Sequence, residues 1–250
     1  MKYATVKIPN KKLFKMYHSL DDREFKTQML EIFKIQHYRL GRRKRNAVYL
    51  DIGANIGAAS IYFKDWAEHI YAIEPSKENF ECLKLNTKPY QNISCHNYAV
   101  YFENGQRKMA RTSTSSPAQT FFPDHDPIGY DTVDTITLDT FFQQEKINHV
   151  DVMKIDVEGS EYVILPDKSF ERVADKIDFI IGEAHFNPGF PEAIPYILKD
   201  YGFETKYLTF NQPNVSHNFT YVDTETSKKK EYHIMVNTIF VARRKNGPTA

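Results

Sequence analysis

An acidic residue and two glycines follow a short apolar run, in the segment Asp-Ile-Gly-Ala-Asn-Ile-Gly from Asp51 to Gly57. The apolar run Ala47 to Leu50 predicts a β-strand, and the glycines permit a sharp turn with close approach of a ligand to the backbone. In a doubly wound α/β sheet, ligands bind in the crevice at the carboxyl ends of the strands. The segment therefore predicts a nucleoside cofactor site, with contacts from Gly53, Ala54, Asn55 and Gly57.

The charges around this turn favour one cofactor. A dinucleotide fingerprint, G-x-G-x-x-G, needs glycine where this chain has Asn55 and Ala58, so the turn fits a pyrophosphate poorly. Asp51 suits a cationic amino group, directly or through water, and S-adenosyl-L-methionine carries one where a dinucleotide carries phosphates. Glu74 ends the next predicted strand, Ile70 to Ile73, and is placed to accept hydrogen bonds from the ribose hydroxyls of either cofactor. Together these residues indicate S-adenosyl-L-methionine, whereas each alone would be ordinary in a tight turn.

Three further polar residues follow later predicted strands. Asp156 follows the predicted strand Val150 to Ile155, and Glu183 and His185 follow the predicted strand Ile177 to Ile181. Because the carboxyl ends of parallel strands face one crevice, these side chains are expected beside the cofactor. His185 is the candidate general base, helped by Asp156 or Glu183, and Asp156 is also a candidate cofactor contact.

Two other interpretations of this second group stay open. The carboxylates of Asp156, Glu158 and Glu161 would be stabilised by the dipole at the start of the next helix without any chemistry. Asp156, Glu183 and His185 could instead coordinate magnesium or manganese, which prefer oxygen-rich sites. Three residues inferred across two strands do not define a ligand set, so no metal is assigned from the sequence.

The predicted elements alternate between strand and helix, which is typical of a mostly parallel sheet covered by helices on both faces. The helix after the glycine turn carries Ala58, Ile61 and Trp66, and a third strand is expected between Ile93 and Val100. After Gly202 the pattern changes to two strands, 203–210 and 235–242, joined by a polar loop. The sequence thus predicts a Rossmann-like, doubly wound α/β fold with an antiparallel ending.

Two stretches stand apart from this alternation. Residues 1–46 are polar, with apolar positions such as Phe25, Met29 and Ile32 at helical spacing, and form a predicted N-terminal helical extension to a domain over 47–250. Residues 111–130 are rich in Ser, Thr, Pro and Asp and are too long for an ordinary connection. We interpret them as a loop on the acceptor side of the site.

Composition restricts the partners. The chain of 250 residues has 33 lysines and arginines against 32 acidic residues, so its overall charge attracts neither nucleic acid nor an anionic membrane. The basic run Arg42 to Arg45 is interpreted as a solvated helix end. Two cysteines do not suggest a disulfide framework, and no run reaches the roughly 18 apolar residues of a membrane span. A cytoplasmic protein without a membrane partner is expected, and no oligomeric state is predicted.

Four blocks carry a family resemblance, in the order Asp-Ile-Gly-Ala-Asn-Ile-Gly, Ala-Ile-Glu-Pro, Ile-Thr-Leu-Asp-Thr-Phe-Phe and Met-Lys-Ile-Asp-Val-Glu-Gly-Ser-Glu. Over about Val48 to Phe240 the chain resembles FkbM-type methyltransferases, most specifically in the block Lys154 to Glu161. The resemblance implies the class I methyltransferase fold, a seven-stranded sheet with an antiparallel C-terminal strand, and use of S-adenosylmethionine. It also implies methyl transfer to a hydroxyl of a sugar, polyketide or glycoconjugate.

Three alternatives remain at this point. One is N- or C-methylation of a macromolecule approached through the basic run. Another is a nucleoside-binding module that keeps Asp51 and Glu74 without turnover. The last is a Rossmann oxidoreductase, which Asn55 and Ala58 disfavour.

Overall fold

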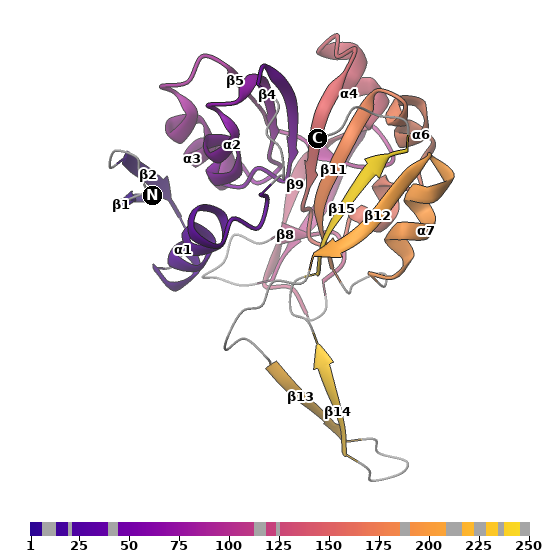
Figure 1. The fold of residues 1–250 in the computed structure, drawn as a ribbon. Coiled ribbons are helices and arrows are strands. Elements are labelled where there is room, and N and C mark those ends of the chain that lie inside the picture. The colour runs from indigo at the N-terminus through magenta and orange to yellow at the C-terminus, as the bar shows by residue number, and fades with distance from the viewer. Residues whose placement is uncertain are drawn as a thin grey trace.

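The computed structural model describes residues 1–6, 14–19, 22–39, 45–112, 119–123, 126–185, 191–208, 217–222, 229–234 and 238–245. Its centre is a seven-stranded sheet in the order β12, β15, β11, β10, β3, β4, β5 (Figure 1). In chain order the strands are β3 (Ala47–Ile52), β4 (Ala67–Ile73), β5 (Ile93–His96), β10 (Val150–Ile155), β11 (Ile177–Ala184), β12 (Phe203–Leu208) and β15 (Thr238–Arg244).

The strand directions confirm the predicted fold class. β3 pairs in parallel with β4 and β10, β4 with β5, and β10 with β11. β15 lies antiparallel between β11 and β12. The chain therefore has a Rossmann-like, doubly wound, mostly parallel seven-stranded sheet with an antiparallel C-terminal strand.

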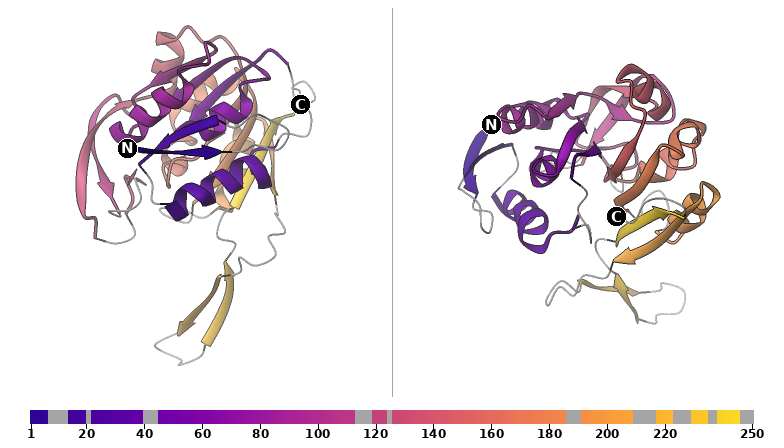
Figure 2. Two further views of the ribbon diagram at one scale, coloured as in Figure 1. Left: turned by 90° about the vertical axis from the view of Figure 1, so that its left-hand side faces the viewer. Right: turned by 45° about the horizontal axis from the view of Figure 1, so that its top comes forward.

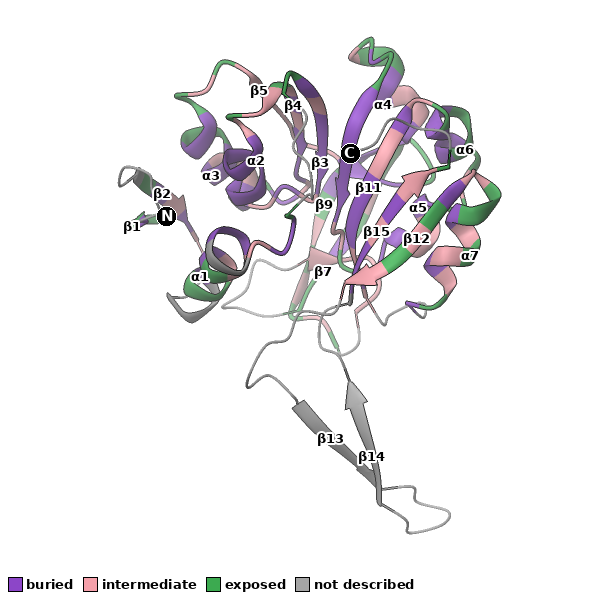
Figure 3. Cartoon of the chain, viewed as in Figure 1, coloured by how far each residue is buried: buried purple, intermediate pink, exposed green. Residues whose placement is uncertain are grey.

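Helices cover both faces because alternate residues of each strand point to opposite sides. In β3, Leu50 and Ile52 pack in one core while Tyr49 packs in the other, and β10 divides Met153 and Val152 in the same way. The central strands are accordingly buried (Figure 3). The helices are α1 (Asp22–Met29), the π-helix η1 (Leu30–Ile35), α2 (Ala58–Phe63), α3 (Lys77–Thr87), α4 (Leu138–Gln144), α5 (Glu161–Ile164), α6 (Lys168–Ala174) and α7 (Ala193–Asp200). Within the described part of the chain, none of these helices has the length and apolar character needed to cross a membrane.

A second sheet corrects two expectations. The single strand expected over 93–100 is wrong, because the chain forms β5 and then β6 (Ala99–Val100), which belongs to another sheet. Between them Asn97 turns away, and its side-chain amide donates to the carbonyl oxygens of Glu74 and Pro75. The second sheet has the order β6, β9, β7, β8, with β7 (Gly105–Arg111), β8 (Gln119–Thr120) and β9 (Gly129–Ile136). Part of the expected 111–130 loop is therefore strand.

The polar segment before the last strand also differs from expectation. It contains the antiparallel strands β13 (His217–Val222) and β14 (Lys229–Ile234), which form a separate two-stranded sheet. A hairpin is held by backbone hydrogen bonds, so it can form without the apolar alternation that reveals a strand in the sequence.

The N-terminal segment packs on the body as part of one core. A two-stranded sheet of β1 (Lys2–Val6) and β2 (Phe14–His18) precedes α1 and was not expected from the sequence. α1 and η1 supply the expected apolar stripe, because Phe25, Met29 and Ile32 are buried in the same cluster as Tyr49 and Ile61. The hairpin and α1 lie on the side of the sheet that carries α2 (Figure 2). Gly41 and the part of the basic run from Arg42 to Lys44 lie outside the described residues.

Candidate active site

A cavity of about 630 Å³ opens where the parallel strands end. Its walls come from the ends of β3, β4, β10 and β11, from α1 and η1, and from the second sheet. The sequence-predicted residues that line it are Gly53, Ala54, Asn55, Glu74, Asp156, Glu183 and His185. Asp51 and Gly57, although described, are not among the lining residues.

The turn after β3 requires its glycines. Gly53 has a φ of 77°, and a Cβ there would lie 1.9 Å from the carbonyl oxygen of Asp156. Gly57 has a φ of 90°, and its Cβ would lie 2.8 Å from Leu83 Cδ1. Asn55 also adopts a positive φ of 50°, and its side-chain oxygen accepts a hydrogen bond of 2.8 Å from the Ile56 amide. The turn is thus fixed by Gly53 against β10 and by Gly57 against α3, which leaves Gly53 to Asn55 facing the cavity.

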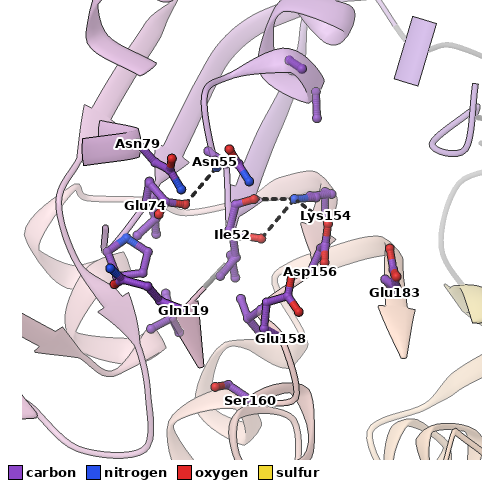
Figure 4. Close-up of a pocket in the computed structure, with 18 of the residues that line it drawn as sticks. Ile52, Asn55, Glu74, Asn79, Gln119, Lys154, Asp156, Glu158, Ser160 and Glu183 are labelled. Carbon is purple, nitrogen blue, oxygen red and sulfur yellow. Dashed lines mark hydrogen bonds and ion pairs between the residues drawn. The ribbon is translucent and has the colours of Figure 1, made fainter. Parts of the chain in front are cut away.

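Glu74 forms one wall of the cavity, together with Asn79 and Gln119 (Figure 4). Its two oxygens accept hydrogen bonds of 2.9 Å from the amides of Asn55 and Ser76. Burial raises the pKa of Glu74 to about 7 in spite of these bonds. The Asn79 side chain also hydrogen-bonds to this carboxylate, which has about four lone-pair sites and so can still accept a hydrogen bond from a ligand hydroxyl.

Asp51 lies beneath the cavity and faces Lys154, which is not among the sequence-predicted site residues. Its Oδ1 is 3.4 Å from Lys154 Nζ, and its Oδ2 accepts a bond of 2.6 Å from the Ser60 hydroxyl. Lys154 Nζ also donates to the Gly53 carbonyl at 2.6 Å and lies 3.5 Å from Asp156 Oδ2. Burial lowers the pKa of Lys154, but Asp51 and Asp156 outweigh it and the pKa is raised overall. In the sequence, Lys154 is distinguished only as the one lysine or arginine within the predicted strand Val150 to Ile155.

At the other end of the cavity four carboxylates surround one imidazole, a group that we name the His185 cluster: Asp156, Glu158, Glu161, Glu183 and His185. His185 Nδ1 lies 2.9 Å from Glu161 Oε1. Its Nε2 lies 3.5 Å from Glu158, 3.8 Å from Glu183 and 3.9 Å from Asp156. The three sequence-predicted residues of the reacting end are therefore brought together, along with Glu158 and Glu161.

The charges of the His185 cluster shift one another's pKa values. Burial lowers the pKa of His185, but the carboxylates of Glu161, Glu158 and Glu183 outweigh it and hold the pKa well above its usual value. Burial and the neighbouring Asp156 raise the pKa of Glu183 well above its usual range. Asp156 behaves oppositely, because Lys154 and His185 outweigh burial and lower its pKa. Because the carboxylates of the cluster outnumber its cations, His185 and Glu183 keep their protons to higher pH than is usual for these side chains.

The N-terminal segment supplies part of the same wall. The Tyr38 hydroxyl donates a hydrogen bond of 2.8 Å to Asp156 Oδ2, and Glu31 and His37 also line the cavity. Burial and Asp156 raise the pKa of Glu31 to about 7. No local pattern in the sequence could find these residues, because their contacts span more than a hundred positions.

Residues of the 111–130 stretch also reach the cavity. Gln119 and Phe121 line it, and the Thr120 hydroxyl donates a hydrogen bond of 2.6 Å to the carbonyl oxygen of Glu158. This stretch thus contacts the backbone of the His185 cluster.

Comparisons with known proteins agree with this geometry. A family model described as the methyltransferase FkbM domain matches residues 51–205, and a search of curated proteins gave no match. Among solved structures, an rRNA methylase from Streptococcus thermophilus has a TM-score of 0.50 at 7% identity, with 84% of this chain and 94% of that chain covered. A SAM-dependent methyltransferase from Agrobacterium tumefaciens has a TM-score of 0.49 at 10% identity, with 98% and 70% covered. At such identity the rRNA methylase shows a shared fold alone.

The family match covers the sequence-predicted residues of the candidate site as well as most of the central sheet. It begins at Asp51 beneath the glycine turn, includes Glu74 and the His185 cluster, and ends within β12, so that it covers more than half of the chain. The chain therefore belongs to the FkbM methyltransferase domain family and is an S-adenosylmethionine-dependent methyltransferase.

Proposed function

We propose that this enzyme methylates a hydroxyl group of a small molecule or glycoconjugate of the sugar or polyketide type. In this proposal the cofactor is contacted by Gly53, Ala54, Asn55, Glu74 and Asp156, with Asp51 and Gly57 supporting the turn from behind, and the reacting end is formed by Asp156, Glu183 and His185. The observation that carries the proposal is the His185 cluster, which lies in the same cavity as the glycine turn and Glu74.

The glycine turn and Glu74 support the cofactor assignment. Gly53 places no side chain at the turn, and the Glu74 carboxylate at the cavity wall can accept hydrogen bonds from ribose hydroxyls. Asp51 and Gly57 support the site from behind: Asp51 holds Lys154, and Lys154 holds the Gly53 carbonyl. S-adenosylmethionine, when bound, supplies a methyl group on a sulfonium centre, whose positive charge favours ionised carboxylates nearby.

The His185 cluster supports transfer to a hydroxyl oxygen. A hydroxyl is a weak nucleophile while it keeps its proton, so the enzyme must align the acceptor oxygen and accept that proton. His185 in its protonated state cannot accept it, whereas the ionised Asp156 and a deprotonated Glu183 can. In this arrangement His185 holds the carboxylates in place, and it can act as a base only in its neutral form.

The charge of the cavity supports a small acceptor over a nucleic acid. Acidic side chains dominate its described charged lining, which comprises Glu31, Glu74, Asp156, Glu158 and Glu183 with Lys154 and the imidazoles of His37 and His185. Nucleic-acid sites present clustered cations to the phosphates, and the described lining of this cavity contains a single lysine among its carboxylates.

The same acidity favours one second candidate, methylation of an amine. A protonated amine would be attracted to the carboxylates, although it would have to lose its proton before attack. The bond formed in the product distinguishes the two, because one reaction yields an ether and the other a methylamine.

The test is transfer of labelled methyl from S-adenosylmethionine into a panel of sugars, glycans, polyketides, amines and RNA, with identification of the labelled product. Calorimetry with S-adenosylhomocysteine and NAD runs in parallel on the same preparation. A labelled ether is expected, with loss of transfer in Asp156→Asn and retained transfer in His149→Ala. A labelled amine or RNA as the main product, or binding of NAD alone, would overturn the proposal.

A further inference from the structure

One wall of the cavity comes from residues 22–39, a segment that lies outside the family match. Six of its residues line the cavity: Thr27, Gln28, Glu31, Ile32, His37 and Tyr38. The other lining residues all lie between positions 52 and 185, within the matched range 51–205. The N-terminal segment therefore adds a wall to the part of the site that the family model covers.

The segment reaches the cavity through an unusual backbone. α1 continues into the π-helix η1, which ends at Gln36 with a φ of 60°, in the left-handed region. The His37 amide then donates a hydrogen bond of 3.0 Å to the Glu31 carbonyl oxygen. π-Helical turns are rare and occur frequently at functional sites, and the left-handed region is unfavourable for a residue with a side chain. This course turns His37 and Tyr38 inward, where both are at most 5% exposed.

Tyr38 and Lys154 both approach one oxygen of the Asp156 carboxylate. The Tyr38 hydroxyl donates a hydrogen bond of 2.8 Å to Oδ2, and Lys154 Nζ lies 3.5 Å from the same atom. The other oxygen, Oδ1, lies 3.9 Å from His185 Nε2. Because both donors are on Oδ2, the carboxylate is oriented with Oδ1 toward the imidazole of the His185 cluster.

The two donors are themselves fixed. Lys154 Nζ donates to the Gly53 carbonyl at 2.6 Å and lies 3.4 Å from Asp51 Oδ1. It also lies 5.5 Å from the centroid of the Tyr38 ring, within the range of a cation–π contact. Tyr38 is thus held between the left-handed turn that precedes it and the Lys154 ammonium, so its hydroxyl has a defined position relative to Asp156.

We propose that Tyr38 is a positioning residue for methyl transfer, which orients the Asp156 carboxylate so that its Oδ1 accepts the proton of the acceptor hydroxyl. The inference deepens the proposed function and rests on it, because it requires a hydroxyl acceptor. A carboxylate that rotates freely would offer either oxygen and would be in an unproductive orientation part of the time.

The step balances without a further reactant. The acceptor O–H bond breaks and its proton passes to Asp156 Oδ1, while the acceptor oxygen forms a bond to the methyl carbon. The carbon–sulfur bond breaks, and its electron pair stays on sulfur. The products are the methyl ether, S-adenosylhomocysteine and a proton that Asp156 then releases to water.

The titratable groups that surround Asp156 come from several elements: Glu31, His37, Tyr38, Lys154, Glu158, Glu161, Glu183 and His185. Burial raises the pKa of Asp156, but the charges of Lys154 and His185 outweigh it, and the pKa is lowered overall. The hydrogen bond from Tyr38 also lowers the pKa of Asp156, because it stabilises the ionised form. Loss of this one donor should therefore raise the pKa of Asp156 while the charged neighbours stay in place.

The experiment compares Tyr38→Phe with the matched control Tyr207→Phe. The Tyr207 hydroxyl donates to the carbonyl oxygen of Pro191, and Tyr207 is not among the lining residues of the cavity. Each variant thus loses one tyrosine hydrogen bond, but only Tyr38→Phe loses it at the site. Tyr38→Phe should lower kcat about tenfold, the equivalent of one charge-assisted hydrogen bond, and should move the acidic limb of the kcat profile to higher pH. Tyr207→Phe should change neither.

Carbon-13 NMR of enzyme labelled at its aspartate carboxyls gives a second readout that needs no acceptor. The Asp156 resonance, assigned by its absence in Asp156→Asn, should titrate at higher pH in Tyr38→Phe than in the wild type. Tyr207→Phe should leave this titration unchanged. His149→Ala should also leave it unchanged, because His149 lies at the opposite end of β10 and is 3.1 Å from Asp178.

Each variant is also titrated with S-adenosylhomocysteine, whose binding reports the fold. The proposal is overturned if Tyr38→Phe binds S-adenosylhomocysteine and keeps both the wild-type kcat profile and the wild-type titration of Asp156, or if Tyr207→Phe shifts them equally. If the wild type methylates only amines or RNA, the proposed function fails, and an unshifted Asp156 titration in Tyr38→Phe would separately overturn the orienting role of Tyr38.

Discussion

Asp51 and Lys154 lie directly opposite each other on the neighbouring parallel strands β3 and β10, and their charged atoms are 3.4 Å apart. Both side chains are at most 5% exposed. The pair is placed beneath the glycine turn, and Lys154 donates to the Gly53 carbonyl at 2.6 Å. Asp51, which the sequence predicted as a cofactor contact, is therefore a structural element beneath the turn, through its ion pair with Lys154.

Lys154→Met should destabilise the protein, because it leaves Asp51 buried without its cation. Removal of one partner from a buried ion pair costs about 3 to 5 kcal/mol in the free energy of unfolding. Urea denaturation followed by circular dichroism measures this loss. The double variant Asp51→Asn with Lys154→Met should recover part of it, since both charges are then gone.

Lys84→Met is the matched control for that experiment. Lys84 pairs with Glu81 at 2.8 Å, but both side chains are nearly half exposed. Such a pair contributes little, so the change should stay within about 0.5 kcal/mol. Equal effects at Lys84 and Lys154 would contradict a structural role for the buried pair.

Gly53→Ala should abolish S-adenosylhomocysteine binding while Gly202→Ala retains it. Both glycines have similar positive φ values, 77° and 83°, so both variants carry a backbone strain of about 1 to 2 kcal/mol. Only at Gly53 would the added carbon meet backbone, at 1.9 Å from the Asp156 carbonyl, whereas at Gly202 the nearest atom is 3.9 Å away. Calorimetry compares the two affinities, and unchanged binding by Gly53→Ala would exclude this turn from the cofactor site.

Part of this site could be predicted from the sequence, and the reason lies in local patterns. The bounds of β10 match the predicted strand Val150 to Ile155, and the glycines mark the turn after β3. Lys154 could also have been selected, as a lone cation inside that run. Tyr38 could not, because nothing near it in the sequence reveals a hydrogen bond to Asp156. The roles assigned to Asp51, Glu74 and the 111–130 stretch stay predictions.

The fold, like the site, could be predicted from the sequence only in part. Strands with an apolar period were found, whereas β13 and β14 were not, because their segment is polar. A single strand was predicted where the chain forms β5 and β6. The turn between them is stabilised by a hydrogen bond from the Asn97 side chain to the Glu74 carbonyl, which the apolar pattern does not reveal. The periodicity of apolar residues predicts which elements are buried against a core. It does not predict turns that are stabilised by side-chain hydrogen bonds.

Cofactor affinity should depend on pH through Glu74. The pKa of Glu74 is raised from 4.5 to about 7, first of all by burial. The ionised form accepts the ribose hydroxyls, so affinity should rise as the pH increases through about 7 and then level off. Stability has the opposite sign: the unfolded chain loses this proton at lower pH than the folded one, so the contribution of Glu74 falls between pH 4.5 and about 7.

Glu74→Gln provides the check. Its affinity for S-adenosylhomocysteine should be about ten- to a hundredfold weaker than that of the wild type at pH 8, because a charge-assisted pair of hydrogen bonds is lost. The glutamine cannot titrate, so the step in affinity near neutral pH should diminish. Calorimetry between pH 5.5 and 8.5 measures both, and an identical pH dependence in the two proteins would assign the titration to another group, such as Glu31.

Substitutions at the reacting end should lower turnover more than they lower cofactor affinity. Asp156→Asn should lower kcat by about 10² to 10⁴, the range that proton transfer contributes. His185→Ala should also lower kcat, because His185 holds the carboxylates of the cluster in place. Tyr38→Phe removes only a hydrogen bond of 2.8 Å to Asp156, so its loss of kcat should be smaller. Affinity for S-adenosylhomocysteine should stay near the wild-type value in His185→Ala and Tyr38→Phe, because the proposed ribose and turn contacts lie at the other wall of the cavity (Figure 4).

Methyl-transfer kinetics under saturating cofactor measure kcat, and His149→Ala serves as the histidine control. His185→Ala with wild-type turnover that chelator does not reduce would leave alignment of the acceptor as the whole of the catalysis.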